Sequence, residues 1–322
     1  MGVSTNTNET YDVTTLREDL QDALISISPT DTPFMTAIGQ KNVGNTYFEW
    51  ATVDLASTDG SNRVIEGEAA PANDAPTNAV RRGNYTQISD KVVEVSDTAE
   101  AVNGAGDAQS LAKQVAYKLK ELKRDMETML TANVAASAGA SGTARQTAGL
   151  PAFLTSNTAG GSGFAVGTTS GSGASGYPDA AATDGTKRDI TEAILKSVIA
   201  SCWDAGAEPS IVLCGSFNKQ EISTFTGNAT KYKDISDKTL SAAIDVYVSD
   251  FGELTIVPSR FSRTRDVFVL DPNYARVAYL KTAAQKPLAR TGHAERRLIS
   301  VEYGLQVDNE AAHGFVADCT TS

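Results

Sequence analysis

The chain has 322 residues, 21% charged and 41% hydrophobic, an ordinary composition for a folded protein of about two domains. With 28 Lys and Arg against 39 Asp and Glu the net charge is −11, which argues against a general affinity for nucleic-acid phosphates but not against enclosing DNA. Three scattered cysteines are too few for a disulfide framework or a zinc site, and no apolar run reaches membrane-spanning length.

The N-terminal region predicts a separate arm. Residues 1–12 are polar and lack the apolar core of a signal peptide, so we expect synthesis and residence in a cytoplasm. A short helix is expected over Thr15–Ile27, because Thr15 and Glu18 have capping-box spacing and Pro29 follows the last turn. Its apolar face, made of Leu16, Leu20, Leu24 and Ile27, must dock somewhere on the molecule.

The next region alternates between strand-like and irregular sequence. The aromatic run Thr46–Asp54 predicts a strand, as do GNYTQI (Gly83–Ile88) and Val92–Ser96. Between them, Leu55–Gly83 is polar, contains two prolines and shows no period. Such a stretch is either a disordered surface loop or a long hairpin that becomes ordered against a neighbour, and the flanking strands favour the hairpin.

One long amphipathic helix is predicted over Asp107–Ala138, with Asp107 as N-cap and Gly139 just beyond the last turn. On a helical wheel the charged residues, Glu127 among them, lie outside an apolar arc of about 100°. That arc holds Ala108, Leu111, Ala112, Val115, Leu119, Leu122, Met126, Met129 and Leu130. A helix this long needs strands across it, and the alternating C-terminal stretch His293–Asp318 (Leu298, Val301, Tyr303, Leu305, Val307) is suited to pack beneath it.

Between these elements lie a Gly-rich segment and a region of mixed elements. The segment 139–185 predicts a flexible loop with an ordered island at AGLPAFL (Ala148–Leu154). From Lys187 to Ala284 the pattern predicts an inserted α+β domain. It would contain a helix marked by Ile190, Ile194, Val198 and Cys202, a strand Ile211–Cys214, a helix capped by Ser216, a hairpin turning at Asp250–Gly252, and a strand Val267–Leu270 closed by an Asp-Pro-Asn turn.

Motifs that carry chemistry are weak here. GSGASG (Gly171–Gly176) fits a dinucleotide pattern but lacks the strand before it and the helix after it. Asp250-Phe251-Gly252 matches the metal-binding tripeptide of protein kinases, but the other kinase motifs are absent from the sequence. Cys214-Gly215-Ser216 faintly resembles the nucleophile elbow of hydrolases, but the full G-x-S-x-G pattern is absent. The acidic group Glu66, Glu68 and Asp74 could hold a cation, but it more readily keeps an exposed arm soluble or pairs with a neighbour. We therefore assign no catalytic residue, no metal site and no cofactor.

The order of elements and several sequence segments resemble one subfamily of the major capsid proteins of tailed double-stranded DNA bacteriophages, which have the HK97-like fold. The matching segments are DTPFMTAIG (Asp31–Gly39), TYFEW (Thr46–Trp50), GNYTQI, VSDTAEAVNGAG (Val95–Gly106), KELKRDMETML (Lys120–Leu130), AGLPAFL and VEYGLQVDNEAAHG (Val301–Gly314). Together they run through nearly the whole chain. Residues 159–185 match nothing in this resemblance and would be a local insertion.

The resemblance implies an α+β fold with named parts. These are an N-terminal arm (1–43), an extended-loop hairpin (44–90), a discontinuous peripheral domain (91–186 and 285–322) with the spine helix at 107–138, and an axial domain (187–284). It also implies a structural virion protein, not an enzyme, that forms the hexamers and pentamers of an icosahedral head around double-stranded DNA. Assembly would take place in the host cytoplasm.

The resemblance also implies partners. We expect a separate scaffolding protein, since the first helix begins almost at once, together with a portal, possible decoration proteins, and no membrane. Candidate contacts between subunits are the charged side chains of the extended loop, Arg63, Glu66, Glu68, Asp74, Arg81 and Arg82. Two rival interpretations remain at this point: a surface-array or other self-assembling structural protein, and a soluble enzyme with an unrecognised site.

Overall fold

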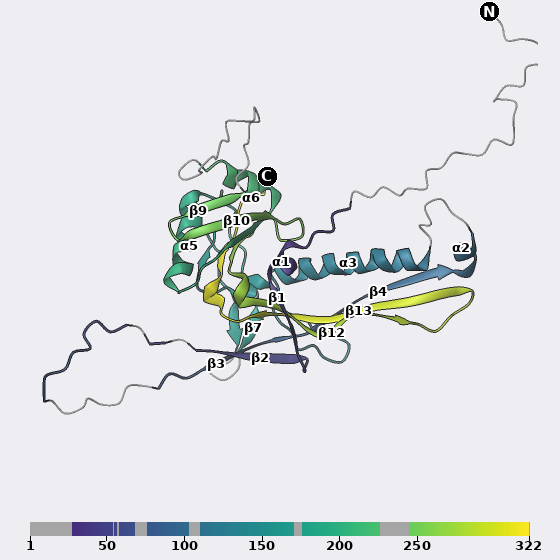
Figure 1. The fold of residues 1–322 in the computed structure, drawn as a ribbon, viewed down its shortest axis with the longest axis horizontal. Helices are drawn as coiled ribbons and strands as arrows, with labels where there is room; N and C mark the ends of the chain where they lie inside the picture. The colour runs from purple at the N-terminus through teal and green to yellow at the C-terminus, as the bar shows by residue number, and fades with distance from the viewer. Residues whose placement is uncertain are drawn as a thin grey trace, which may run out of the picture.

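A computed structural model describes residues 28–53, 55–56, 58–67, 76–102, 110–170, 176–225 and 245–321. The helix predicted over Thr15–Ile27, the proposed cap Asp107 and the contact residues Glu68 and Asp74 lie outside these ranges. Within the described ranges, two sheets with their own helices form the body, and a two-stranded hairpin projects from it (Figure 1).

A four-stranded sheet carries the long helix. Its order is β1 (Gly39–Asn42), β12 (Ala275–Pro287), β13 (Ala294–Val307) and β4 (Gln87–Ser96), with β1 parallel to β12 and the other pairs antiparallel. On β13, Ile299 and every residue from Val301 to Val307 are buried. The apolar side chains of this run are the odd-numbered ones and begin at Ile299, not at the half-buried Leu298. The expectation that these strands pack under the helix is confirmed, since the helix contacts both β4 and β13.

The long helix, α3, runs from Leu111 to Thr131 and is shorter than predicted at both ends. Its N-cap is Ser110, whose hydroxyl accepts from the backbone N–H of Lys113, so the assignment of Asp107 as cap was wrong. At the other end the helix stops at Thr131, and the backbone of Ala132 is extended. Hydrogen bonds to distant parts of the chain replace the helical ones here. Gly149 N–H donates to the Val134 carbonyl (3.0 Å), and a side chain at position 149 would collide with the Ala132 carbonyl.

The buried face of α3 differs partly from the wheel. Leu111, Leu122, Met126 and Leu130 are buried as predicted, whereas Ala112 is exposed. The polar side chain of Glu127, which the wheel places on the solvent side, is fully buried. A wheel drawn for one helix does not include the arm that covers this position.

A six-stranded sheet forms the second unit, in the order β5-β14-β11-β8-β10-β9. Its strands are β5 (Thr158–Ala159), β14 (Gly314–Val316), β11 (Val267–Leu270), β8 (Ile211–Cys214), β10 (Gly252–Pro258) and β9 (Val246–Ser249). Helix α5 (Glu192–Asp204) packs on β14 and β5, and α6 (Ser216–Ser223) packs on β10. The predicted β9–β10 hairpin and both helices are confirmed, but the N-cap of α6 is Gly215, not Ser216.

Sheet membership crosses the expected domain boundaries. β12 lies in the four-stranded sheet although it begins within the segment 187–284, and β5 and β14 join the six-stranded sheet from outside that segment. The chain changes sheets at a 3-10 turn, Pro272–Tyr274, where the Asp271 side chain accepts from the backbone N–H of Asn273. The Asp-Pro-Asn turn is therefore one place where the chain passes between the two units, and the connection from β13 to β14 is another.

The Gly-rich segment is not the flexible loop that its composition predicts. It contains the antiparallel pair β6 (Thr168–Ser170) and β7 (Tyr177–Ala180), and Gly161 lies so close to the Thr186 carbonyl that any side chain would collide with it. The glycines of this segment allow close packing of backbone against backbone. The ordered island is confirmed as the buried helix α4 (Leu150–Phe153).

The remaining elements are short. The arm contains α1 (Pro33–Ala37), the projecting hairpin pairs β2 (Tyr47–Thr52) with β3 (Val80–Tyr85), α2 (Asp97–Ala101) follows β4, and a 3-10 turn (Glu310–Ala312) precedes β14. No helix of the described ranges is both long enough and apolar enough to span a membrane.

Candidate assembly surfaces

The projecting hairpin is fixed firmly at its root. Asn84 of β3 is fully buried and uses both ends of its side-chain amide. The Oδ1 atom accepts from the backbone N–H groups of Tyr85 (2.8 Å) and Ala148 (3.0 Å). The Nδ2 group donates to Thr147 Oγ1 (2.9 Å) and to the Leu305 carbonyl (2.7 Å). These bonds tie β3 to the loop before α4 and to the central strand β13.

Beyond its root the hairpin leaves the body. Every described residue between positions 53 and 79 is exposed, and the two chain segments extend away from both sheets (Figure 1). The expectation of a hairpin is confirmed for β2 and β3, which pair from Tyr47–Tyr85 to Thr52–Val80. Between Thr52 and Val80 the described residues form no strand.

The charged residues predicted as subunit contacts separate into three groups. Arg63 and Glu66 are exposed on the projecting loop. Arg81 already forms an ion pair with Glu49 across the hairpin, and Arg82 lies at the root, where its backbone forms a bridge with Gly176. Glu68 and Asp74 lie outside the described residues.

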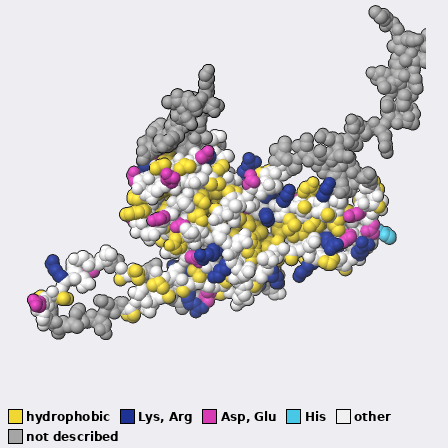
Figure 2. Space-filling view, viewed as in Figure 1, with side chains coloured by type: hydrophobic (Ala, Val, Ile, Leu, Met, Phe, Trp, Pro, Cys, Tyr) yellow, Lys and Arg dark blue, Asp and Glu magenta, His cyan; other side chains and the backbone are white. Residues whose placement is uncertain are grey.

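The loop also exposes large apolar side chains, which the emphasis on charge missed. Val53, Leu55, Val64 and Ile65 are 56–84% exposed, and Figure 2 shows hydrophobic atoms along this projection. Burying each such side chain fully is worth about 1.5–3 kcal/mol, more than an exposed ion pair supplies. The sequence contains these apolar residues as VDL (53–55) and VI (64–65) within an otherwise polar stretch, and this pattern could have indicated them.

The arm is anchored to α3 by a buried carboxylate. Glu127 Oε1 and Oε2 accept from the backbone N–H groups of Phe34 (2.7 Å) and Met35 (2.9 Å), which lie in the first turn of α1. The Phe34 side chain is completely buried beside it. Burial raises the pKa of Glu127, and the two backbone hydrogen bonds partly offset this rise.

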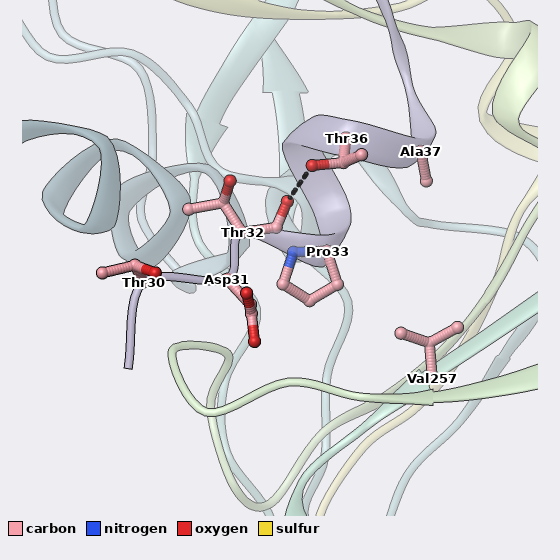
Figure 3. A pocket seen from close by; sticks show the side chains of 7 residues that line it. All are labelled: Thr30, Asp31, Thr32, Pro33, Thr36, Ala37 and Val257. Carbon is pink, nitrogen blue, oxygen red and sulfur yellow. Dashed lines mark hydrogen bonds between the residues drawn. The ribbon is translucent and has the colours of Figure 1, made fainter. Parts of the chain in front are cut away.

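The opposite side of the arm is only loosely covered. A depression of about 510 Å³ lies between α1 and Val257 of β10, lined otherwise by arm residues from Thr30 to Ala37 (Figure 3). Thr36 closes the first turn there by donating its hydroxyl hydrogen to the Thr32 carbonyl (2.7 Å). The arm is therefore held mainly through α3 and through the pairing of β1 with β12.

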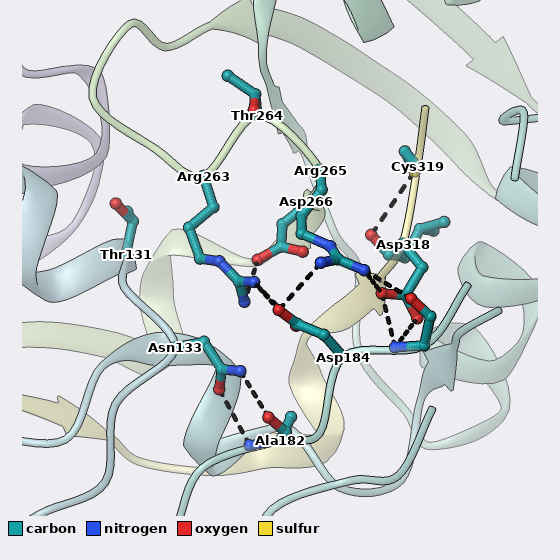
Figure 4. Close-up of polar contacts among 12 residues, drawn as sticks. Thr131, Asn133, Ala182, Asp184, Arg263, Thr264, Arg265, Asp266, Asp318 and Cys319 are labelled. Atoms are coloured by element: carbon teal, nitrogen blue, oxygen red, sulfur yellow. Dashed lines mark hydrogen bonds and ion pairs between the residues drawn. The ribbon is translucent and has the colours of Figure 1, made fainter. Parts of the chain in front are cut away.

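A cluster of charges joins the Gly-rich segment, the β10–β11 connection and the C-terminal segment (Figure 4). Arg263 pairs with Asp184 (2.6 Å) and Asp266 (3.1 Å), and Arg265 pairs with Asp184 (3.0 Å) and Asp318. The Asp318 carboxylate also accepts from the backbone N–H groups of Gly161 and Gly185. Asp266 is 1% exposed, and burial raises its pKa to about 7, with Arg263 acting in the opposite direction.

An apolar patch marks the free edge of the six-stranded sheet. Val246 and Val248 are exposed on β9, and Trp203 and Phe251, whose rings lie 5.1 Å apart, are also partly exposed. A depression of about 260 Å³ separates α5 from the β9–β10 turn at Phe251. The patch is another surface that the described part of the chain leaves uncovered.

The buried thiols and the buried histidine of the described ranges are placed unfavourably for catalysis. Burial raises the pKa of the Cys202, Cys214 and Cys319 thiols to about 12 and lowers that of His313 to about 4. Asp250-Phe251-Gly252 forms the β9–β10 turn. In the described ranges, no group of His, Cys, Asp and Glu side chains is arranged to hold a metal ion.

A long helix over long antiparallel strands, a second sheet joined to them and a hairpin projecting from their base define the HK97-like fold of tailed-phage capsid proteins. The chain superposes on a solved structure from Mycobacterium phage Adephagia with a TM-score of 0.62, covering 98% of this chain and 99% of that one at 10% identity. The capsid structure of the cyanophage P-SCSP1u gives a TM-score of 0.60, with 100% and 98% covered at 13% identity. At these identities the likeness establishes the fold.

The model of the SU10 major capsid protein family matches residues 3–320, so this chain belongs to that family. The major capsid protein of Escherichia phage Phieco32 is 41% identical over 104 residues. That match spans 32% of this chain and 29% of the relative, less than a third of the relative's length. The protein is thus a phage major capsid protein, a structural part of the virion and not an enzyme.

Proposed function

We propose that this subunit forms hexamers and pentamers that close into an icosahedral head around the double-stranded DNA of a tailed phage. Assembly would take place in the host cytoplasm with a separate scaffolding protein, a portal and possible decoration proteins. Residues 1–43 act as the arm and 44–90 as the extended loop. The segments 91–186 and 285–322 supply most of the peripheral domain and 187–284 most of the axial domain, with β12 in the peripheral sheet and β5 and β14 in the axial sheet. In the axial domain the six-stranded sheet is the structural unit.

One observation carries this proposal: the extended loop is rigid at its root and uncovered beyond it. The buried amide of Asn84 fixes where the hairpin leaves the body, while Leu55 and Ile65 are at least three-quarters exposed. A protein rarely leaves several large apolar side chains exposed together unless a partner covers them. A neighbouring subunit is that partner in this proposal.

The charged residues of the loop would set the register of this contact. Arg63, Glu66, Glu68 and Asp74 are proposed to pair with a neighbour, and Arg81 and Arg82 to support the root. Exposed pairs contribute about 0–1 kcal/mol each, so apolar burial supplies most of the energy. In a closed symmetric shell each subunit makes the contact twice, once with its own loop and once as the receiver.

Deleting Thr58–Ala79 and joining the ends with a short Gly-Ser link tests the proposal. The variant should keep its circular dichroism and a cooperative melt, because no described residue of this segment is buried, yet form no shells under electron microscopy. A matched control replaces the same residues with a Gly-Ser linker of equal length. If assembly requires the side chains of the loop and not only its length, this control should also form no shells. If both variants form shells, the segment is only a surface loop and the proposal is wrong. If the deletion variant does not fold, the segment is part of the core and the extended-loop assignment is wrong.

A further inference from the structure

Three passages of the chain between the two sheets meet at one place. The chain passes from β11 to β12, from β13 to β14, and from α4, which packs on α3 and β13, to β5. We call these three segments together the crossing, and they comprise residues 154–157, 271–274 and 308–313. A change in the relative position of the two sheets therefore acts on the crossing.

The segment between β13 and β14 holds the other two segments of the crossing in place. The backbone N–H of Asp308 donates to the Tyr274 carbonyl (2.8 Å). The side-chain amide of Asn157 donates to the Ala311 carbonyl (2.7 Å). The crossing is thus a small hydrogen-bonded unit that links the two sheets.

His313 lies at the end of this central segment and is fully buried. Its Nδ1 atom accepts from the backbone N–H of Asp271 (3.4 Å), which ties the β13–β14 connection to the β11–β12 passage. An imidazole that accepts through Nδ1 is neutral and carries its proton on Nε2. Burial lowers the pKa of His313 to about 4, with the backbone of Tyr274 and three carboxylates acting in the opposite direction. The ring is therefore held in its neutral form.

The three carboxylates belong to Asp271, from the β11–β12 passage, and to Asp308 and Glu310, from the β13–β14 connection. Each of them already has a partner within or beside the crossing. These partners are the backbone N–H of Asn273 for Asp271 (3.1 Å), Arg276 for Asp308, and the backbone N–H groups of Thr155 (2.9 Å) and Ser156 (3.2 Å) for Glu310. A protonated His313 could pair with one of these carboxylates only in competition with the partner that it has now.

We propose that His313 is a latch that holds the crossing closed while its imidazole is neutral and opens it when the imidazole takes up a proton. Protonated Nδ1 can no longer accept from Asp271, and a buried cation then faces that N–H group at a high cost in free energy. The cation also draws Asp308 or Glu310 from its present partner. The two sheets then loosen relative to each other while each sheet remains folded. This device belongs to the subunit and does not depend on the proposed assembly.

The direction of the pH dependence follows from the lowered pKa. In the open crossing the ring meets water and its pKa returns toward the ordinary value of 6.5, so the open form binds the proton more tightly. The closed form is fully favoured above pH 6.5 and loses this advantage as the pH falls toward 4. Between pH 7.5 and pH 5 the ratio of open to closed crossing should rise about tenfold or more. Asp266 acts in the opposite direction, because its raised pKa favours the folded state in acid.

Hydrogen exchange of the Asp271 amide in the dissociated full-length subunit measures this opening directly. After correction for the intrinsic pH dependence of exchange, its protection should fall about tenfold or more from pH 7.5 to pH 5, while the amides of Phe268 and Tyr303 inside the two sheets keep theirs. His313→Asn should abolish the change, because the Asn Oδ1 atom can accept in place of Nδ1 and does not ionise. His293→Asn is the matched control and should keep the change, since His293 is the other histidine of the chain and is exposed between β12 and β13.

A distance measurement shows whether the sheets themselves move. Spin labels at Lys286→Cys on β12 and Glu253→Cys on β10 occupy exposed positions, and the three native cysteines are buried. Their distance distribution should broaden from pH 7.5 to pH 5, and it should not broaden when His313→Asn is added. Labels that keep one distance would overturn the proposal.

The wild-type protein alone can also overturn it, so the test stands even if His313→Asn does not fold. Unchanged protection of the Asp271 amide at pH 5 would contradict the latch. An equal loss of protection at Phe268 and Tyr303 would show unfolding of the sheets in place of opening between them. A response that persists in His313→Asn would assign the effect to another group.

Discussion

The extended loop and the C-terminal strands contain similar residue types but differ completely in their environment. Residues 312–319, which include β14, are buried without interruption, and Phe315 stacks on Phe268 of β11 with ring centroids 5.3 Å apart. Between positions 53 and 79 every described residue is exposed, although Val53, Leu55, Val64 and Ile65 are equally apolar. One region completes the fold within the chain, and the other is the region that, in the proposed assembly, a second chain covers. Stability of the subunit and assembly of the shell should therefore be separable by mutation.

The largest loss of stability should come from the buried face of α3. Met126→Asp would place an unpaired charge at a position that is 3% exposed, and it should lower the free energy of unfolding by about 3–5 kcal/mol. Thr128→Asp, the same new side chain two residues further on the exposed face, should change it by under about 0.5 kcal/mol. Urea denaturation of both variants checks this. Equal midpoints would show that the buried face is assigned incorrectly.

The root of the hairpin should behave as part of the body. Asn84→Ala removes four hydrogen bonds and leaves buried partners on Thr147, Ala148 and Leu305, so it should cost about 2–4 kcal/mol. Asn45→Ala, an exposed asparagine just before β2, should cost under about 1 kcal/mol. Thermal melts of the dissociated subunit measure the difference. If Asn84→Ala melts like the wild type, the hairpin is not rigidly mounted.

The charge cluster at the junction should make stability depend on pH. Because burial raises the pKa of Asp266 to about 7, the folded state binds its proton more tightly than the unfolded state between about pH 4 and 7. Its contribution is fully present below pH 4 and is lost as the pH rises toward 7. Asp266→Asn should flatten this part of the profile relative to the wild type.

Asp184→Asn is the matched control for that profile, since it changes a more exposed carboxylate of the same cluster. Unfolding midpoints from pH 4 to 8 provide the measurement. A profile that keeps its slope in Asp266→Asn would exclude this carboxyl as the cause.

The smallest effect on folding should come from the loop itself. Leu55→Ser combined with Ile65→Ser should leave the unfolding free energy of the dissociated subunit within about 0.5 kcal/mol, because neither side chain is buried. The same variant should need a higher protein concentration to form shells, since the buried apolar area is lost. Light scattering against concentration checks this. A destabilised subunit with normal assembly would reverse the roles of the two regions.

Much of the fold could be predicted because apolar periodicity records packing within one element. The alternation along β13, the stripe of α3 and the β9–β10 hairpin could all be read in this way. What periodicity missed depends on segments distant in the sequence. The burial of Glu127 comes from residues 93 positions away, and the end of α3 depends on Gly149. The order in the Gly-rich segment comes from Asp318 and its backbone donors, which composition does not reveal.

The candidate contact surface was only partly predictable for a similar reason. The charged residues of the loop are evident in the sequence, but their ion-pair partners are not. Arg81, for example, forms an ion pair with Glu49 inside the hairpin. The exposed apolar side chains are ordinary residues in the sequence and become informative only when the structure shows that nothing in the described chain covers them. Sequence thus located the loop, and the structure indicated which side chains a neighbour would cover.

Hydrogen exchange of the extended loop, compared between assembled shells and dissociated subunits, tests the central claim most directly. In dissociated subunits the backbone amides of residues 58–67 should exchange rapidly, as expected for exposed residues outside any strand or helix. In shells the same amides should become protected, whereas those of β13 should be protected in both states. Rapid exchange of residues 58–67 in intact shells would contradict the account, because the loop would then remain uncovered where a neighbouring subunit is required.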